Sequence, residues 1–188
     1  MLSEDDLEQQ CLQWFAVQGW EVLHGPDIAP DGDNPLRASF HDVFLRPVML
    51  EQLQTINPHL PVSVLEEVIL RITRPESPDL VVSNKAFHHL LLDGVPVEYK
   101  REDKTVHDKA LLMDFNHPGN NRFMVVNQVA IQGIKQVRRP DIICYINGLP
   151  VAVIELKSPI DANADIWAAF NQLQTYKNEL SDLFICNE

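Results

Sequence analysis

Two apolar runs joined by an Asn-Gly pair constrain the fold of this chain more than any other feature. They lie in RRPDIICYINGLPVAVIELKSP, residues 138–159. An Asn-Gly pair between apolar runs is a strong signal for a β-hairpin, because both residues tolerate the positive φ of a tight turn. The second run, Val151 to Ile154, is continuous, as expected of a strand buried on both faces. The sequence therefore predicts a buried hairpin.

Charged residues lie at the ends of both strands of this hairpin. Asp141 begins the first strand, and Glu155 and Lys157 end the second. Side chains alternate along a strand, so Glu155 and Lys157 share a face, and buried charges are costly unless they are used. Two converging carboxylates suit Mg²⁺, and a nearby lysine can orient water and offset charge on a phosphate. The pattern favours phosphodiester hydrolysis; a surface ion pair at a strand end is the alternative.

The register of the hairpin decides whether Asp141 joins Glu155. Opposed residues share a face, so these two can meet only if the numbers of paired residues add up to an even sum. A two-residue turn pairs Ile146 with Leu149, and that sum is odd. We therefore predict either a three-residue loop with a bulge at Gly148 or another bulge further along.

The periodicity of the remaining sequence predicts an α/β fold, in which helices flank a central sheet that is mostly antiparallel or mixed. Helices are predicted over residues 4–18, 45–56, 62–73, 84–92 and 164–180. Strands are predicted for WEVLH, VPVEYK, ALLMDF, RFMVVNQVAI, DIICYI, PVAVIELK and the final LFICNE. Residues 25–37 form a loop, residues 45–92 form a helical insertion, and the strands after Gly94 form an antiparallel meander.

Composition is compatible with one domain, because 188 residues of which 45% are hydrophobic can bury a substantial core. The chain has no signal peptide and no apolar run long enough to span a membrane, so we expect a cytoplasmic protein. The histidines are scattered and do not predict a zinc site. Three widely separated cysteines are expected to be reduced core residues: Cys11, Cys144 and Cys186.

A net charge of −12 at first argues against a nucleic-acid partner, because phosphate binding normally requires a basic surface. The charge is unevenly distributed, however. Residues 1–33 contain eight acidic and no basic residues, whereas the hairpin region carries Lys135, Arg138, Arg139 and Lys157. The region around the hairpin is therefore locally basic.

Arg139-Pro140-Asp141, followed after thirteen residues by Glu155-Leu156-Lys157, resembles the PD-(D/E)xK nuclease signature. The fuller string, with NNRFMVVNQVAI before it and AFNQLQTY after it, resembles the N-terminal region of the type I restriction endonuclease R (motor) subunit. That resemblance covers residues 120–187 most strongly. It implies a restriction-endonuclease-like fold over residues 1–188, as one nuclease domain of a longer chain that carries an ATP-dependent motor.

The resemblance also implies roles for individual residues. Asp141 and Glu155 would bind Mg²⁺, for which Mn²⁺ is expected to substitute, with the main-chain carbonyl of Leu156 as a third ligand. Lys157 would be the catalytic lysine. Gln172 and Tyr176 match a Q-x-x-x-Y motif linked to DNA handling, and their spacing places them on one helix face. Glu8 is a further candidate ligand from the first helix.

The resemblance further implies double-stranded DNA and the methyltransferase and specificity subunits as partners. The chain contains no G-x-x-x-x-G-K-[ST] string, so ATP would be needed only by a motor region outside it. Three alternatives stay open: a nuclease-like module for DNA binding or subunit docking without cleavage, a solvated Glu8, and a solvated Gln172 beside a half-buried Tyr176. Alone, the chain is expected to cut DNA poorly and without sequence preference.

Overall fold

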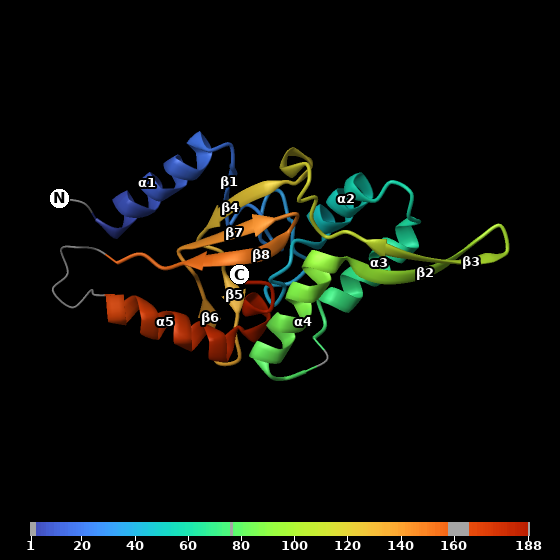
Figure 1. The fold of residues 1–188 in the computed structure, drawn as a ribbon. Helices are drawn as coiled ribbons and strands as arrows, with labels where there is room; N and C mark the ends of the chain where they lie inside the picture. Colours follow the sequence, from blue (N-terminus) through green and yellow to red (C-terminus); the bar gives the residue numbers. More distant parts are fainter. Residues whose placement is uncertain (1–2, 76, 158–165, 188) are drawn as a thin grey trace.

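The computed structural model describes residues 3–75, 77–157 and 166–187 (Figure 1). Its centre is a four-stranded sheet with the order β1 (Glu21–His24), β4 (Phe123–Asn127), β7 (Ile142–Ile146) and β8 (Leu149–Ile154). Strand β1 pairs with β4 in parallel, and the other neighbours are antiparallel. The predicted α/β class with a mixed sheet is confirmed, and β4, β7 and β8 are its antiparallel part.

The two faces of this sheet are covered by different helices. Helix α1 (Glu4–Val17) packs with Leu12 against one face, where it meets Val125, Ile142 and Cys144. The other face belongs to the main core, which includes Ile143 and residues from α2, α3, α4 and α5. Successive strand residues alternate between these two cores, as the period of two requires. The start of β7 and the end of β8 lie between α1 and α5 (Ile166–Glu179), as Figure 1 shows.

The three helices predicted between residues 45 and 92 are confirmed as α2 (Arg46–Ile56), α3 (Val62–Ile72) and α4 (Leu80–Asp93). Helix α4 begins four residues before the predicted residue 84, because the Asp79 carboxylate caps it by accepting hydrogen bonds from Val81 N and Val82 N. At the N-terminus, Ser3 and Asp6 form a capping box that starts α1. Residues 164 and 165 of the last predicted helix lie outside the described residues.

One predicted strand pairing and two predicted strands are wrong. VPVEYK forms β2 (Val95–Arg101), which pairs with β3 (Lys104–Ala110) in a separate two-stranded sheet instead of joining the meander. Of ALLMDF, only Ala110 belongs to a strand, because Asp114 accepts hydrogen bonds from Asn116 N and His117 N and so begins a turn. LFICNE forms no strand in its described part, because its first two residues belong to a 3₁₀ helix, η2 (Ser181–Phe184). Periodicity alone cannot distinguish a short buried strand from a short buried helix.

A fourth difference concerns RFMVVNQVAI, for which the sequence predicts one strand. It divides at Gln128, whose φ of 53° breaks the extended backbone after β4. The chain then continues into a short hairpin of β5 (Ile131–Gln132) and β6 (Val137–Arg138). The three cysteines are reduced thiols, as predicted, although Cys11 is only partly buried. No helix within the described residues is long and apolar enough to cross a membrane.

Candidate active site

The β7–β8 hairpin contains the register change that the sequence requires. Its turn is the two-residue form, with positive φ at Asn147 (53°) and Gly148 (81°), and Ile146 pairs with Leu149. The register then shifts between Cys144 and Tyr145, after which Ile142 pairs with Ile154. Because the sums of paired numbers become even, Asp141 and Glu155 fall on the same face. The predicted bulge further along is confirmed, and the three-residue loop is not formed.

Asp141 is held in place by the neighbouring strand end. Its Oδ2 accepts a hydrogen bond of 2.7 Å from the backbone N–H of Leu156. Burial raises the pKa of Asp141, whereas the Leu156 N–H and the Lys157 ammonium lower it. The backbone carbonyl of Asp141 also accepts from Gln128 N at 3.0 Å. The hydrogen bond from the Leu156 N–H to Asp141 fixes the distance between the start of β7 and the end of β8. Metal binding by the Leu156 carbonyl stays a prediction.

Glu155 is the most unusual group at the site. Its side chain is 0% exposed, and neither carboxylate oxygen has a hydrogen-bond partner among the described residues. Burial, followed by the charge of Asp141, raises the pKa of Glu155 to about 7, although the nearby Tyr176 hydroxyl and Lys157 oppose the rise. A buried carboxylate that accepts no hydrogen bond is costly in a folded protein. The oxygens of Glu155 therefore fit a hard divalent cation that would supply the missing partner.

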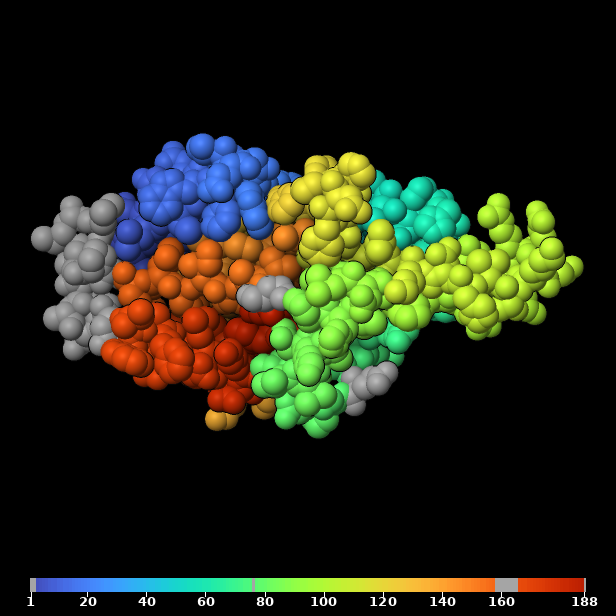
Figure 2. Space-filling model, viewed as in Figure 1, coloured from blue at the N-terminus to red at the C-terminus, as the bar shows by residue number. Residues whose placement is uncertain are grey.

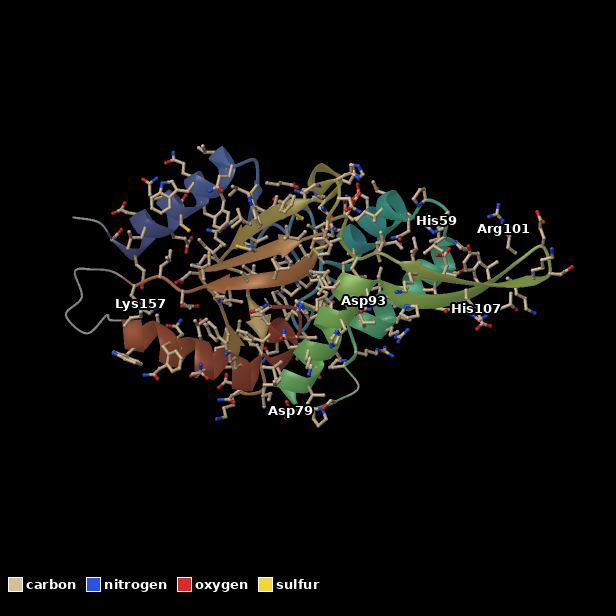
Figure 3. The ribbon with its side chains drawn as sticks, viewed as in Figure 1. His59, Asp79, Asp93, Arg101, His107 and Lys157 are labelled. Carbon is tan, nitrogen blue, oxygen red and sulfur yellow. The ribbon has the colours of Figure 1, made fainter. Side chains whose placement is uncertain are left out.

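Lys157 lies at the same end of the sheet, between α1 and α5 (Figure 3). Its Nζ is 3.8 Å from Glu155 Oε2 and 3.5 Å from Glu4 Oε1 in α1. The side chain is 22% exposed, so the ammonium can reach both the buried carboxylate and a ligand that arrives from solvent. The structure thus brings together the three residues that the sequence motif predicted: Asp141, Glu155 and Lys157.

Helix α5 adds Gln172 and Tyr176 to this cluster. Gln172 Nε2 donates to the Tyr176 hydroxyl at 2.8 Å, and that hydroxyl donates a long bond of 3.5 Å to the Arg139 carbonyl. Tyr176 is 2% exposed, and burial raises its pKa. Arg138 and Glu179 fasten the helix through two bonds of 2.8 and 2.9 Å. The two motif residues therefore face the carboxylates. Tyr176 is more buried than the alternative interpretation, a half-buried tyrosine, assumed.

Glu8 is not the solvated carboxylate that one of its two sequence interpretations assumed. It is buried, and its two oxygens accept bonds of 2.6 Å each from Asn127 Nδ2 and Gln128 Nε2. Its charge raises the pKa of Asp141, so it lies near the site. Even so, within the described residues no group of three His, Cys, Asp or Glu side chains is arranged to hold a metal ion. A solvated Glu8 is excluded by this burial, and direct metal binding by Glu8 stays an untested prediction.

Sequence reasoning missed the residues that hold Glu8. Asn127 ends the buried strand β4, and its Oδ1 lies 3.0 Å from His24 Nδ1 at the end of β1. Gln128 follows in the left-handed region, which is uncommon for a residue with a side chain. A usable signal existed, because polar residues directly follow an apolar run here just as Glu155 follows Val151 to Ile154. His24, Asn127 and Gln128 could have been found in this way.

Comparisons of the sequence with known proteins find a family and several relatives. The sequence model of the family described as Type I restriction enzyme R protein N terminus matches residues 1–186. The chain is 41% identical, over its whole length, to the type I restriction enzyme HindI endonuclease subunit of Haemophilus influenzae, of which it covers 18%. It is 36% identical over 90 residues, 48% of its length, to the type I restriction enzyme SsaAORF53P endonuclease subunit of Staphylococcus saprophyticus, of which it covers 9%. The chain thus spans less than a fifth of the length of these relatives.

Proposed function

Because this chain belongs to the family of type I restriction enzyme R protein N termini, we propose that it hydrolyses phosphodiester bonds of double-stranded DNA with Mg²⁺ held by Asp141 and Glu155. The observation that carries the proposal is the buried carboxylate of Glu155, which accepts no hydrogen bond from the described residues. The bulge in the hairpin places it beside Asp141, and the Lys157 ammonium lies 3.8 Å away. Such a pair of oxygen ligands with an adjacent cation suits cleavage of a phosphate ester.

Each residue of the cluster has a separate task in this mechanism. The bound cation would polarise the scissile phosphate and lower the pKa of water. Lys157 Nζ orients the attacking water and offsets the negative charge that develops on the phosphate oxygens. Leu156 N–H keeps the Asp141 carboxylate oriented, and the Gln172–Tyr176 pair encloses Glu155 from the side of α5. Glu4 pairs with the Lys157 ammonium at the solvent-exposed side of the site until a DNA phosphate takes the place of the Glu4 carboxylate.

In this proposal, DNA is delivered to the site by other parts of a type I enzyme. The net charge of −12 disfavours binding to duplex phosphates by the chain alone. A motor region, together with methyltransferase and specificity subunits, would hold DNA against the site and raise its local concentration to roughly millimolar, as a short tether does. Cleavage would then follow translocation, and ATP would be used by the motor alone.

The proposal is tested in the complete enzyme with Asp141→Ala, Glu155→Ala and Lys157→Ala. We expect each variant to lose cleavage of plasmid DNA in Mg²⁺ while DNA translocation and ATP hydrolysis continue, because the motor is not altered. Lys85→Ala, which removes an exposed lysine from α4, is the matched control and should cleave normally. Calorimetric titration with Mn²⁺ should show weaker binding only in the two carboxylate variants. Cleavage that survives in all three variants would favour the alternative of a docking module without its own activity.

A further inference from the structure

Four polar residues form a row along one edge of the central sheet. Strand β1 ends at His24, and β4 ends beside it at Asn127, because the two strands are parallel. Asp141 directly precedes β7, and Glu155 directly follows β8, at the same edge. In the space-filling view, α1 (blue) lies against the β7–β8 hairpin (orange), so side chains of α1 can reach this edge (Figure 2). The candidate active site thus occupies one half of the row, and His24 and Asn127 form the other half.

Glu8 extends from α1 to this row and is held there by uncharged groups. Asn127 Nδ2 and Gln128 Nε2 each donate to one of its oxygens at 2.6 Å. Among the residues that the structure describes, no lysine, arginine or histidine forms an ion pair with Glu8. An amide donor holds a carboxylate without neutralising it, whereas a lysine or arginine would cancel its charge. The two contacts therefore fix Glu8 and leave its negative charge uncompensated.

Gln128 joins Glu8 to the strand end that carries Asp141. Its side chain donates to Glu8, and its backbone N–H donates to the Asp141 carbonyl at 3.0 Å. Gln128 makes these two contacts at a φ of 53°, where a residue with a side chain is strained. Glycine would adopt this φ without strain, but it has no side chain that could reach Glu8. The strained backbone is thus explained by the two contacts, which set the position of Glu8 relative to Asp141.

Asn127 is itself oriented by His24. The Oδ1 atom of Asn127 lies 3.0 Å from His24 Nδ1. Because Oδ1 can only accept a hydrogen bond, His24 Nδ1 carries the proton in this contact. The contact fixes which end of the Asn127 amide faces Glu8, so that Nδ2 is the donor. A chain of hydrogen bonds therefore leads from the exposed His24 through Asn127 to the buried Glu8.

We propose that Gln128 and Asn127 are positioning residues, which hold the charge of Glu8 beside Asp141 and Glu155 and so strengthen divalent-cation binding by this cluster. The inference rests on the proposed function, in which Asp141 and Glu155 bind Mg²⁺. Each further negative charge fixed nearby in a poorly solvated place increases the Coulomb attraction of the cluster for a divalent cation. The two amides act only through Glu8, as partners that orient the surroundings of a metal do.

The experiment measures Mn²⁺ binding to the purified protein without DNA by calorimetric titration. Glu8→Gln removes the charge and should keep both hydrogen bonds, because the Gln128 amide can turn and accept one. It should weaken Mn²⁺ binding by about 10- to 100-fold, the usual effect of losing an outer partner of a metal site. Gln128→Gly removes one donor without straining the backbone and should weaken binding by about 10-fold. Gln132→Gly is the matched control and should bind as the wild type does, because the Gln132 amide donates only to the Gly133 carbonyl.

The double variant Glu8→Gln/Gln128→Gly separates a positioning role from a structural one. If Gln128 acts through the charge of Glu8, the double variant should bind Mn²⁺ as weakly as Glu8→Gln alone. A structural role would weaken binding by the same factor in both backgrounds. His24→Ala changes an exposed residue at the far end of the hydrogen-bond chain, and it should weaken binding in the wild type but not in Glu8→Gln. Urea unfolding of each variant checks that it is folded at the temperature of the titration.

Three results would overturn the proposal: wild-type affinity in Glu8→Gln, equal losses in Gln128→Gly and Gln132→Gly, or a loss from Gln128→Gly that is as large in Glu8→Gln as in the wild type. The two proposals can fail separately. If Asp141→Ala abolishes Mn²⁺ binding while the Glu8 and Gln128 variants leave it unchanged, only the positioning role fails. If the double variant behaves as expected and the complete enzyme never cleaves DNA, only the proposed function fails. Absence of Mn²⁺ binding by the wild type would overturn both.

Discussion

Replacing Glu155 by Gln should stabilise the metal-free protein at alkaline pH while abolishing cleavage. The folded protein holds Glu155 at a pKa of about 7, against an ordinary value of 4.5, mainly because its side chain is buried. Ionising it in the folded state costs about 3 kcal/mol once the pH is well above 7. Gln carries no charge, has nearly the same shape, and removes this cost.

The sign of the pH dependence follows from the direction of the shift. Below pH 4.5 the carboxyl group is protonated in both the folded and the unfolded chain, so it adds no pH dependence. Between 4.5 and about 7 only the unfolded chain loses its proton, and the stability of the folded wild type falls as pH rises. Urea unfolding in EDTA at several pH values should therefore show a difference in the free energy of unfolding that grows in favour of Glu155→Gln from pH 4.5 to 8.

Two further measurements make this prediction sharp. Mg²⁺ should raise the free energy of unfolding of the wild type at pH 8 and leave the variant unchanged, because a ligand stabilises only the state that binds it. Glu179→Gln in helix α5 is the control with the opposite sign. Arg138 lowers the pKa of Glu179, so this variant should be less stable near neutral pH, with a difference that shrinks as pH falls. A Glu155→Gln variant that is less stable than the wild type at pH 8 would refute the argument.

The remaining predictions concern the neighbours of the carboxylates and the hairpin. Gln128→Ala should lower the free energy of unfolding by about 1–3 kcal/mol, since it leaves one buried oxygen of Glu8 without its donor. Gln128→Gly should lower it less, because glycine adopts the φ of 53° without strain. Urea unfolding of both variants measures the difference. Tyr176→Phe should reduce plasmid cleavage and raise the pKa of Glu155 further, with an unchanged circular dichroism spectrum, since the hydroxyl that favours the ionised carboxylate is removed; an unaltered pH profile of cleavage would contradict this role. Deleting Val151, the extra residue of the bulge, should preserve Mn²⁺ binding, because a regular hairpin then still pairs Asp141 with Glu155. Deleting Val151 and Ala152 together should abolish Mn²⁺ binding, because Glu155 then turns to the face of α1; full affinity in this double deletion would show that register does not control the site.

Much of the site could be predicted because its signals are local. The Asn-Gly turn, the apolar runs and the residues at their ends lie within residues 138–159, and simple parity required a bulge. The position of that bulge, between Cys144 and Tyr145, could not be predicted. It depends on how the fully buried Tyr145 packs within the main core, which is a property of the whole fold. Likewise, Glu8 meets Asn127 across 119 residues of sequence, and no local pattern announces such a contact.

The fold is predicted well where one periodicity dominates and poorly where partner choice matters. Helices α2 and α3 begin and end within one residue of their predicted limits, because apolar spacing and flanking prolines agree. The sequence VPVEYK is correctly predicted as a strand, but nothing local indicates that it pairs only with residues 104–110. Strand β1 is predicted as well, while its parallel pairing with β4 depends on tertiary contacts.

Because of the bulge in the hairpin, the number of residues between the two motif carboxylates indicates the backbone geometry of the same hairpin in other sequences. Thirteen residues separate Asp141 from Glu155, and an odd number combined with a two-residue turn demands one extra residue in a strand. A homologous hairpin with an even number of intervening residues and the same turn needs no bulge to bring its carboxylates together. Insertions and deletions in this hairpin should therefore change its length by two residues. A change of one residue should occur only where a bulge is gained or lost. The number of residues between the two acidic residues that match Asp141 and Glu155 would then indicate whether the backbone of a related hairpin is regular or bulged.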